Sequence, residues 1–442
     1  MVYNAKVEEE KMATIVLKSI MAENFASFAE RMIFTCVADE SKKEHQMNTF
    51  TVGNDSINKV SYIYGANGSG KTFFCKILRE IQKMIALSPL SMMKNSQLKA
   101  MLQNEGLTRS VPGFAFDMKY KEMPTTLGIE LIVDNITYHY EFSVLDQKIV
   151  YELLTKKYRR TEKILERFSP AYQDILLKSE LKTFEDTKKV VKEDALCLAM
   201  AAMLNDEFAN MVVDAIRGIN VFNMTSPRLD PGESEAFTDD RIKKYVEILR
   251  KADPTIRKIE VKFEEEEIVR QKIESDDFEN REIIQTKTTV GVKSEHALYD
   301  NGIEIGVGTD QIDFFKDESL GTIKLFTTLP YLYDVLEEGG ILFLDEIENG
   351  LHPALVKEMI TLFTEEESNP CHAQLICTTH QPLLVSENVK RDQVWILSKD
   401  KLGKSVLKRL SDKSFSRTKV NITNKILEGA LGCNPEKFFK IT

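Results

Sequence analysis

The sequence predicts an α/β fold built around a phosphate-binding loop, and three observations lead to that class. An eight-residue stretch between an apolar strand and a helix fits the pattern G-x-x-x-x-G-K-[ST], namely Gly65, Ala66, Asn67, Gly68, Ser69, Gly70, Lys71 and Thr72. An apolar run at 341–344 ends in the carboxylates of Asp345 and Glu346. The 274 positions between Lys71 and Asp345 (345 − 71) exceed what one βαβ unit needs, so an insertion must separate the two halves.

The glycines explain why this loop suits phosphate. Gly65, Gly68 and Gly70 let the backbone turn tightly, so that successive N–H groups point at phosphate oxygens. The helix that follows adds the positive end of its dipole. Lys71 would reach the β- and γ-phosphates of ATP, and the Thr72 hydroxyl would bind Mg²⁺. A chance match in a glycine-rich turn is the alternative, and the flanking strand and helix argue against it.

Strand and helix periodicities place the elements of the first third of the chain. Alternating apolar residues favour strands, a 3.6-residue period favours a helix, and an Asp-Asn pair between two alternating runs favours a hairpin. The predicted elements are a loose charged tail over 1–12, two strands within 15–34, the loop strand at 60–64, the loop helix at 72–87, a helix near 92–101, and a hairpin formed by 126–133 and 136–144.

The rest of the chain begins with a change of composition. Residues 151–217 are rich in Lys, Glu, Leu and Ala and poor in glycine, which predicts several helices. The later elements are a loop over 223–238, a helix at 239–252, strands at 256–267, 283–294 and 303–305, a helix at 322–336, a buried strand at 340–344, a helix at 353–367, and strands at 374–379 and 393–398.

Composition describes an ordinary soluble globular protein, with 43% apolar and 29% charged residues. The formal charge of −10 argues against non-specific binding to nucleic acid. Residues 390–442 are an exception, with 13 Lys and Arg against 5 Asp and Glu. This basic segment suits a nucleic-acid patch or a dock for an acidic partner, while a solvated face is the simpler interpretation.

Cysteine usage points to a reducing compartment. The six cysteines are scattered, with no C-x-x-C pair and no zinc spacing with histidine. The N-terminus has no apolar signal core, and the most apolar helix, at 195–204, is too short to span a bilayer. We therefore expect a cytoplasmic protein without a membrane partner.

The acidic pair supplies the second half of a nucleotide site. We expect its strand to lie beside the loop strand, with Asp345 in the Mg²⁺ shell and Glu346 orienting and deprotonating the attacking water. An acidic pair after a strand is weak evidence alone, since it could be a helix start. Together with the phosphate loop it indicates ATP hydrolysis.

Three further segments accompany this pair. Residues 317–322 open a helix with Ser319 and Gly321, residues suited to hold a γ-phosphate at a helix N-terminus. Residues 348–353 follow the carboxylates directly. A strand at 375–379 ends in His380, which we interpret as a γ-phosphate sensor; a hydrogen-bonded loop histidine is the alternative.

The order of these motifs resembles the ABC/SMC-type ATPases. The series comprises Asn-Phe-Ala-Ser-Phe at 24–28, the phosphate loop, Glu-Ser-Leu-Gly at 318–321, Asp-Glu-Ile-Glu-Asn-Gly-Leu-His-Pro at 345–353 and Thr-Thr-His at 378–380. Within that group the chain is similar to the RecF- and OLD-like, AAA-type branch of prokaryotic phage-defence systems, such as the PARIS AriA, Septu PtuA and RloA-like ATPase subunits. The resemblance covers about 14–150 and 300–442.

The resemblance implies an ABC/SMC-type P-loop ATPase head with a helical insertion, and roles for particular residues. Lys71 and Thr72 would bind phosphate and Mg²⁺, Asp345 and Glu346 would form the acidic pair, and His380 would be the switch histidine. Ser319 and Gly321 would meet the ATP held by a second subunit.

Two departures from the family pattern stand out. The segment Ser-Leu-Gly-Thr stands where the family's signature motif usually reads Leu-Ser-Gly-Gly-Gln. The position of the Q-loop is not identified, because neither Gln97 nor Gln103 can be assigned to it.

We expect four segments: a flexible tail at 1–12, the N-terminal part of the head at 13–150, a helical insertion for assembly or partner recognition at 151–252, and the C-terminal part of the head at 253–442. Clusters of basic residues in the insertion, at 156–160 and 188–189, are candidates for binding an acidic protein or DNA that acts as the trigger. The simpler interpretation is that they lie on solvated helix faces.

The function implied by the resemblance is an ATPase that joins head to head in a homo-oligomer, senses phage infection and controls an effector. An OLD-type protein would continue into a nuclease domain after the ATPase motifs, so we expect a nuclease or toxin acting in trans. The trigger that activates the ATPase could be DNA or a phage protein, and the sequence does not distinguish the two. A RecF-like ATPase of DNA repair or chromosome maintenance is the main alternative; a transporter ATPase and a non-catalytic scaffold fit the motifs less well.

Overall fold

The computed structural model describes residues 14–39, 46–92, 111–168, 175–185, 188–223, 229, 235–275, 278–308, 312–385 and 388–412. The chain divides into two units. The first consists of 1–222, 334–348 and 353–442, and the second of 223–333 and 349–352. The predicted tail at 1–12, the predicted helix near 92–101 beyond residue 92, and most of the basic C-terminal segment lie outside the described residues.

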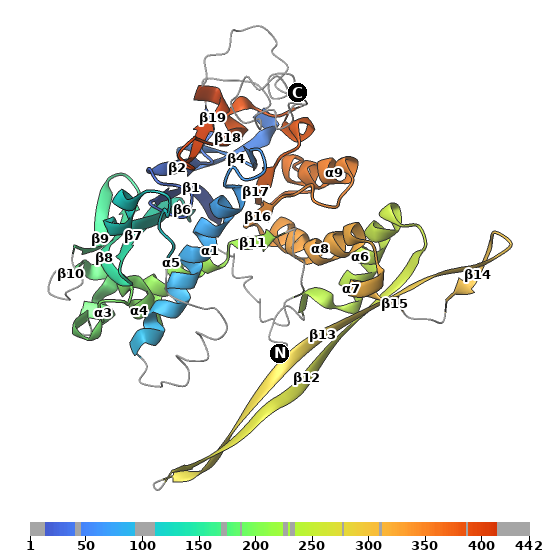
Figure 1. Cartoon of the computed structure of the whole chain (residues 1–442), viewed down its shortest axis with the longest axis horizontal. Helices are drawn as coiled ribbons and strands as arrows, with labels where there is room; N and C mark the ends of the chain where they lie inside the picture. The colour runs from blue at the N-terminus through green and yellow to red at the C-terminus, as the bar shows by residue number, and fades with distance from the viewer. Residues whose placement is uncertain are drawn as a thin grey trace, which may run out of the picture. The chain divides into compact units, whose positions relative to one another are not determined.

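A six-stranded sheet carries the loop strand (Figure 1). Its order is β11 (Asn220–Asn223), β16 (Ile341–Asp345), β17 (Gln374–Thr379), β5 (Val60–Tyr64), β18 (Val394–Lys399) and β19 (Ser405–Arg409). The four strands from β16 to β18 are parallel, and β19 returns antiparallel to β18. Strands β5, β16 and β17 are buried along their whole length, as their apolar runs predict for a parallel sheet that is covered on both faces.

The position of β17 corrects one expectation. We expected the acidic strand to lie beside the loop strand, but β17 lies between them, pairing with β16 on one edge and with β5 on the other. The sequence orders the motifs along the chain only, whereas the sheet order depends on which apolar faces the crossover helices cover.

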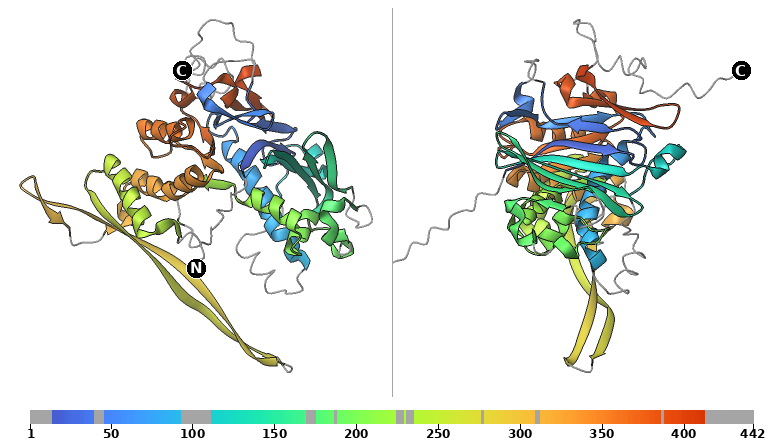
Figure 2. Two further views of the ribbon diagram at one scale, coloured as in Figure 1. Left: turned by 180° about the vertical axis from the view of Figure 1, so that it is seen from behind. Right: turned by 90° about the vertical axis from the view of Figure 1, so that its left-hand side faces the viewer.

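A second, seven-stranded sheet is antiparallel and belongs to the same unit (Figure 2). Its order is β10 (Ile175–Leu177), β9 (Thr161–Arg167), β8 (Lys148–Lys157), β7 (Ile136–Leu145), β6 (Thr125–Val133), β1 (Ile15–Glu23) and β2 (Met32–Thr35). The hairpin predicted around Asp134 and Asn135 is confirmed, and both residues have positive φ, as a tight hairpin turn requires.

Helix α1 (Lys71–Leu87) fills the space between the two sheets. Its buried face contributes to one apolar cluster that also contains residues of β1, β6, β16, β17 and β18. Phe74 shows this arrangement, because its ring lies 5.1 Å from that of Phe34 and 6.4 Å from that of Phe343. The helix that follows the phosphate loop is therefore fixed on both sides by packing.

A buried glutamine connects the two sheets. Gln374, at the start of β17, is 1% exposed. Its Oε1 accepts a hydrogen bond from the Leu17 backbone N at 2.7 Å, and its Nε2 donates to the Leu17 carbonyl at 3.1 Å. Leu17 lies where β1 carries a bulge and beyond the end of its pairing with β2, so the side-chain amide replaces a missing strand partner.

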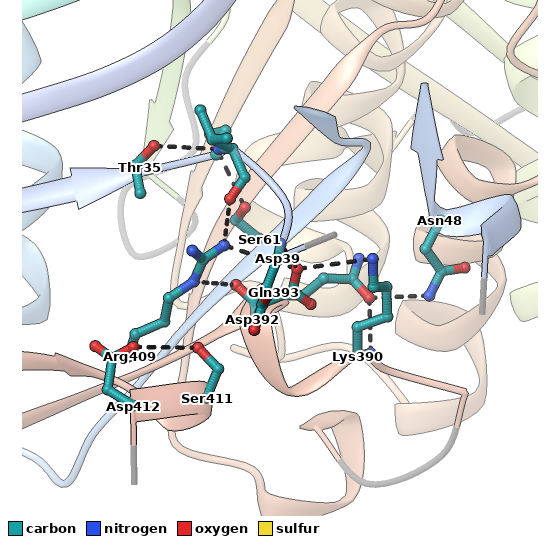
Figure 3. A network of polar contacts seen from close by, with 12 residues as sticks. Thr35, Asp39, Asn48, Ser61, Lys390, Asp392, Gln393, Arg409, Ser411 and Asp412 are labelled. Atoms are coloured by element: carbon teal, nitrogen blue, oxygen red, sulfur yellow. Dashed lines mark hydrogen bonds and ion pairs between the residues drawn. The ribbon is translucent and has the colours of Figure 1, made fainter. Parts of the chain in front are cut away.

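Polar contacts also join the N-terminal residues of this unit to its C-terminal strands (Figure 3). The Arg409 Nε donates to the Asp392 carbonyl at 2.7 Å, and the Asp392 carboxylate accepts from the Asp39 backbone N at 2.6 Å. The Gln393 Nε2 donates to the Val60 carbonyl at 2.8 Å, directly at the start of the loop strand. In the basic segment Lys390 is buried and Arg409 largely so, which makes these two cations structural and not a solvated face.

The helical insertion predicted at 151–252 is wrong in its first part and in its bounds. Strands β8, β9 and β10 occupy 148–177 and belong to the antiparallel sheet of the first unit. The Lys- and Glu-rich composition concealed a two-residue period, in which charges pair across strands: Lys156 lies opposite Glu162 and forms an ion pair with Glu180. The helices α4 (Cys197–Met203) and α5 (Glu207–Arg217) agree with the helices predicted for the stretch up to 217, but they too belong to the first unit.

The polar core of this region is centred on Glu152, which is fully buried on β8. Its carboxylate accepts hydrogen bonds from the backbone N atoms of Cys197 and Leu198, at 2.7 and 3.0 Å, and from the Tyr140 hydroxyl at 2.9 Å. The carboxylate thus satisfies free N–H groups at the start of α4.

The separate unit of the chain begins at residue 223, not 151, and it is mixed, not helical. It contains α6 (Asp239–Ala252), α7 (Phe314–Asp317), the start of α8 (Leu320–Glu338), and the strands β12 (Ile256–Ser275), β13 (Phe278–Asp300), β14 (Ile303–Val307) and β15 (Ile312–Asp313). Strands β12 and β13 form one long two-stranded ribbon (Figure 1), which we call the arm. The aromatic rings of Phe237, Tyr245, Phe314 and Phe326 form the core of this unit.

We predict that Gln374→Leu lowers the free energy of unfolding by roughly 2–4 kcal/mol, because it leaves the buried N–H and carbonyl of Leu17 without partners. Urea denaturation followed by the fluorescence of Trp395, the single tryptophan, reports on this unit. Gln381→Leu is the matched control, because within the described ranges the hydrogen bonds of Gln381 come from its backbone. Equal midpoints for the two variants would contradict the connecting role of Gln374.

Candidate functional site

The site lies at one edge of the parallel sheet. The phosphate loop follows β5, Asp345 ends β16 and is followed by Glu346, and His380 follows β17. These three strands are adjacent, and the carboxyl ends of parallel strands meet at the same edge. The structure therefore brings Lys71, Asp345, Glu346 and His380 together in the first unit.

The loop connects β5 to α1 as the sequence predicts. The Gly65 backbone N donates to the Thr379 carbonyl on β17 at 3.1 Å, which ties the first loop residue to the neighbouring strand. Gly70 has φ +112, and a Cβ on it would lie 2.5 Å from Ser405 Oγ and 2.8 Å from Ser27 Oγ. Only glycine fits this position, because both the backbone conformation and the space exclude a side chain.

Two serines contact each other beside the phosphate loop, and one of them binds a loop carbonyl. The Ser405 Oγ donates to the Ser69 carbonyl at 2.7 Å and lies 2.8 Å from the Ser27 Oγ. Ser27 belongs to the Asn-Phe-Ala-Ser-Phe segment at 24–28, and the Asn24 side chain of the same segment binds the carbonyls of Tyr120 and Met123. This motif therefore acts as a support of the phosphate loop.

Lys71 is 4% exposed, and its Nζ donates to the carbonyls of Gly65 and Ala66 at 2.9 and 3.1 Å. Burial lowers the pKa of Lys71, whereas the carboxylates of Glu346, Glu348 and Asp345 oppose this shift. The Lys71 charge thus lies within the field of three carboxylates, and a phosphate group would complete its coordination.

Thr378 holds the acidic pair. Its fully buried Oγ1 donates to Asp345 Oδ1 at 2.7 Å and accepts from the Glu346 backbone N at 2.7 Å. Glu346 has φ +56, a left-handed conformation that costs a non-glycine residue about 1–3 kcal/mol. One hydroxyl on β17 therefore fixes the carboxylate of Asp345 and the strained backbone of Glu346 together.

Glu348 holds the histidine. Its Oε1 accepts from the His380 backbone N at 2.6 Å and lies 2.7 Å from the ring Nδ1. The carboxyl is 3% exposed while the ring is 45% exposed, so the Nδ1 edge is fixed and the ring remains accessible. Among the described residues, Glu348 Oε2 is buried without a hydrogen-bond partner.

Ser319 and Gly321 lie in the second unit. Ser319 is exposed at the start of α8, and its Oγ accepts from the Thr322 backbone N at 3.1 Å, as a helix cap does. A Cβ on Gly321 would lie 2.7 Å from the Gly350 carbonyl, so glycine allows these two segments to approach closely. Lys324 Nζ donates to the Asn349 carbonyl at 2.9 Å and fixes the same segment.

The donor set fits Mg²⁺ with a nucleotide. Within the described ranges, no group of three or more His, Cys, Asp or Glu side chains is placed to hold a metal ion. Mg²⁺ in nucleotide sites takes one or two protein ligands, with phosphate oxygens and water completing its shell. The exposed Thr72 hydroxyl and the Asp345 carboxylate, held in place by Thr378, are ligands of this kind.

Comparison with known families decides the class of this site. A family model described as "AAA domain, putative AbiEii toxin, Type IV TA system" matches residues 60–189 and 223–386. The chain belongs to this AAA family. The first matched segment of this chain contains the phosphate loop. The second contains the acidic pair and His380.

Two solved structures similar to this AAA-family chain are heads of SMC proteins. One is described as an SmcHead bound to the C-winged helix domain of ScpA, with 14% identity, a TM-score of 0.42, and coverage of 90% of this chain and 99% of that one. The other is the SMC head domain from Thermotoga maritima, with 10% identity, a TM-score of 0.35, and coverage of 89% and 98%. No curated protein matches the chain. Among the described residues of this AAA-family chain, no helix is both long and apolar enough to cross a membrane.

Sequence reasoning missed the roles of Thr378, Glu348, Ser27 and Ser405. Thr378 and Glu348 stand inside motifs that it had singled out, two positions from His380 and Glu346 respectively, so proximity to those residues was an available signal. No such signal marked Ser405, because it lies 336 positions from the loop carbonyl that it binds.

We predict that Gly70→Ala destabilises the ligand-free protein by about 1–3 kcal/mol more than Gly68→Ala, because only position 70 combines positive φ with a steric conflict. Gly68 also has positive φ, but a Cβ there meets nothing within 4 Å. Denaturation midpoints measure the effect; equal midpoints for the two alanine variants would contradict this packing.

Proposed function

We propose that this chain is an ATPase in which ATP binding joins two heads and hydrolysis releases them. The observation that carries the proposal is the meeting of the phosphate loop, Asp345, Glu346 and His380 at one edge of the parallel sheet, held there by Thr378 and Glu348. Membership of an AAA family supports nucleotide binding at this site.

The roles follow from the chemistry of each side chain. Lys71 and the loop N–H groups bind the β- and γ-phosphates, and Thr72 with Asp345 holds Mg²⁺. When bound there, Mg²⁺ would neutralise charge on the phosphate oxygens. Glu346 accepts a proton from the attacking water.

His380 then senses the γ-phosphate. The Nδ1 edge of the ring lies 2.7 Å from Glu348 Oε1 and the ring is 45% exposed, so its Nε2 edge is available to a γ-phosphate oxygen. The buried Glu348 carboxylate fixes the orientation of the ring.

The oligomer follows from the position of Ser319. A hydroxyl and a glycine at the start of a helix offer N–H groups to a phosphate, and Ser319 is exposed. In our proposal this segment completes the ATP site of a second copy, so that each site is shared between two chains.

The biological role that we propose is the control of an effector in antiviral defence or abortive infection. The family description names a toxin of a type IV toxin–antitoxin system, which suits a two-component module. The effector would be a nuclease or toxin acting in trans, and the trigger DNA or a phage protein.

We predict different defects for two substitutions in the site. Glu346→Gln should bind MgATP but hydrolyse it at least about 100-fold more slowly, because the water loses its base while the phosphate cradle stays intact. Lys71→Ala should instead lose nucleotide affinity, because the β- and γ-phosphates lose their main side-chain partner.

Nucleotide titration and phosphate release measure the two effects separately. Lys76→Ala, an exposed lysine on the same helix, and Glu367→Gln, an exposed carboxylate, are the matched controls. Near-wild-type turnover in Glu346→Gln would remove this residue from catalysis, and unchanged affinity in Lys71→Ala would remove the loop from phosphate binding.

We further predict that Ser319→Arg abolishes hydrolysis without preventing one chain from binding ATP, because the bulky side chain disrupts only the ATP site of the second copy that this helix start faces. An equal mixture with Glu346→Gln should regain up to roughly a quarter of the wild-type turnover, because half of the dimers are mixed and each contains one complete site. A mixture as inactive as either variant alone would rule out the shared site.

A further inference from the structure

A chain of polar contacts links the arm to the residue directly before Ser319. The Glu318 side chain is 5% exposed. Its Oε1 accepts a hydrogen bond from Ser294 Oγ at 2.5 Å and lies 2.6 Å from His296 Nε2. Ser294 and His296 are two positions apart on β13, so they face the same side of the strand.

The other nitrogen of His296 continues this chain. Its Nδ1 lies 2.8 Å from the hydroxyl of Thr255, and that hydroxyl donates to Asp253 Oδ1 at 2.6 Å. His296 Nε2 faces the Glu318 carboxylate, which only accepts hydrogen bonds, so the ring contacts polar groups on both sides at the base of the arm.

The base of the arm is firmly placed within its unit. The Ala297 backbone N donates to the Thr255 carbonyl at 2.7 Å, and the Gly308 backbone N donates to the His296 carbonyl at 2.8 Å. Strand β15 pairs with β13 at Lys293 and Ser294. A shift of β13 at this point therefore moves both donors of the Glu318 carboxylate together.

Glu318 transmits such a shift because its burial depends on these donors. A buried carboxylate without hydrogen bonds is costly, so Glu318 follows Ser294 and His296. The next residue, Ser319, caps α8: its Oγ accepts from the Thr322 backbone N at 3.1 Å and its carbonyl from the Ile323 backbone N at 3.0 Å. The orientation of Ser319 is thus set on one side by α8 and on the other by the arm.

We propose that the arm regulates the shared ATP site, with His296 as the positioning residue that fixes Glu318 and thereby Ser319. The inference rests on the proposed function, because it concerns the regulation of the same site. A partner that bends or straightens the arm would change how well Ser319 meets the ATP of a second copy, without touching the phosphate loop. His296 itself contacts no nucleotide in this scheme.

The test uses the full chain with ATP and Mg²⁺. In the Glu346→Gln background, His296→Ala should raise the ATP concentration needed for dimerisation by at least about tenfold, measured by light scattering. In the otherwise unchanged protein it should lower kcat by a similar factor, while the nucleotide affinity of the single chain stays within about twofold. His296→Gln, which keeps one donor, should recover part of both losses.

Two further variants separate positioning from folding. Ser294→Ala removes the second donor of Glu318 with little change of volume, and should give a smaller defect of the same kind. Lys258→Ala removes a pair with Glu295 on the same ribbon, where the lysine is 58% exposed, and should leave dimerisation and kcat unchanged. Wild-type dimerisation and kcat in a folded His296→Ala protein would overturn the proposal, as would an equal defect in Lys258→Ala.

Hydrogen exchange distinguishes this proposal from the proposed function. Without nucleotide, His296→Ala should raise the exchange rates of the Thr322 and Ile323 amides, which Ser319 holds, relative to Lys258→Ala. Unchanged rates would overturn the link between arm and Ser319, even in a protein that dimerises. If His296→Ala speeds this exchange while the wild-type chain binds ATP but never dimerises, the link between arm and Ser319 is preserved and the shared ATP site is rejected.

Discussion

The site depends on strand β17 and on one of its hydroxyls. β17 pairs with β16 on one edge and with β5 on the other, so it determines the distance between the acidic pair and the phosphate loop. Thr378 then fixes Asp345 by its hydroxyl proton and the Glu346 backbone by its oxygen lone pair. A hydroxyl is the smallest group that donates and accepts at once, which explains its place between two groups of opposite hydrogen-bonding need.

The rest of the first unit keeps these strands in place. Helix α1 is buried between the parallel and antiparallel sheets, so the phosphate loop at its start has little freedom to move. Gln374 ties β17 to the bulge of β1, and Gln393 ties β18 to the start of β5. Gln374 thus joins the parallel sheet to the antiparallel sheet, whereas Gln393 joins two neighbouring strands of the parallel sheet.

The site where chemistry is proposed contains backbone strain and a buried polar atom without a described partner. Glu346 has a left-handed backbone, Glu348 has a buried oxygen without a described partner, and burial lowers the pKa of Lys71. Each of these features costs stability in the ligand-free protein, and the surrounding network of Thr378 and His380 maintains them. In the second unit a buried carboxylate is likewise held by neighbouring side chains, because Glu318 contacts two side chains of β13.

The sequence by itself determined the phosphate loop, its flanking strand and helix, the acidic pair and the histidine, because each depends on residues adjacent in the chain. It also determined the α/β class, the hairpin at Asp134 and the α8 start at Ser319. Only the tertiary structure decided that β17 separates β5 from β16, that 148–177 forms strands, and that the separate unit begins at 223. It alone showed that Ser405 supports the loop and that His296 holds Glu318. The reason is physical: these contacts join residues far apart in the chain, and their partners are chosen by packing and by the hydrogen-bonding needs of buried groups, which no local pattern records.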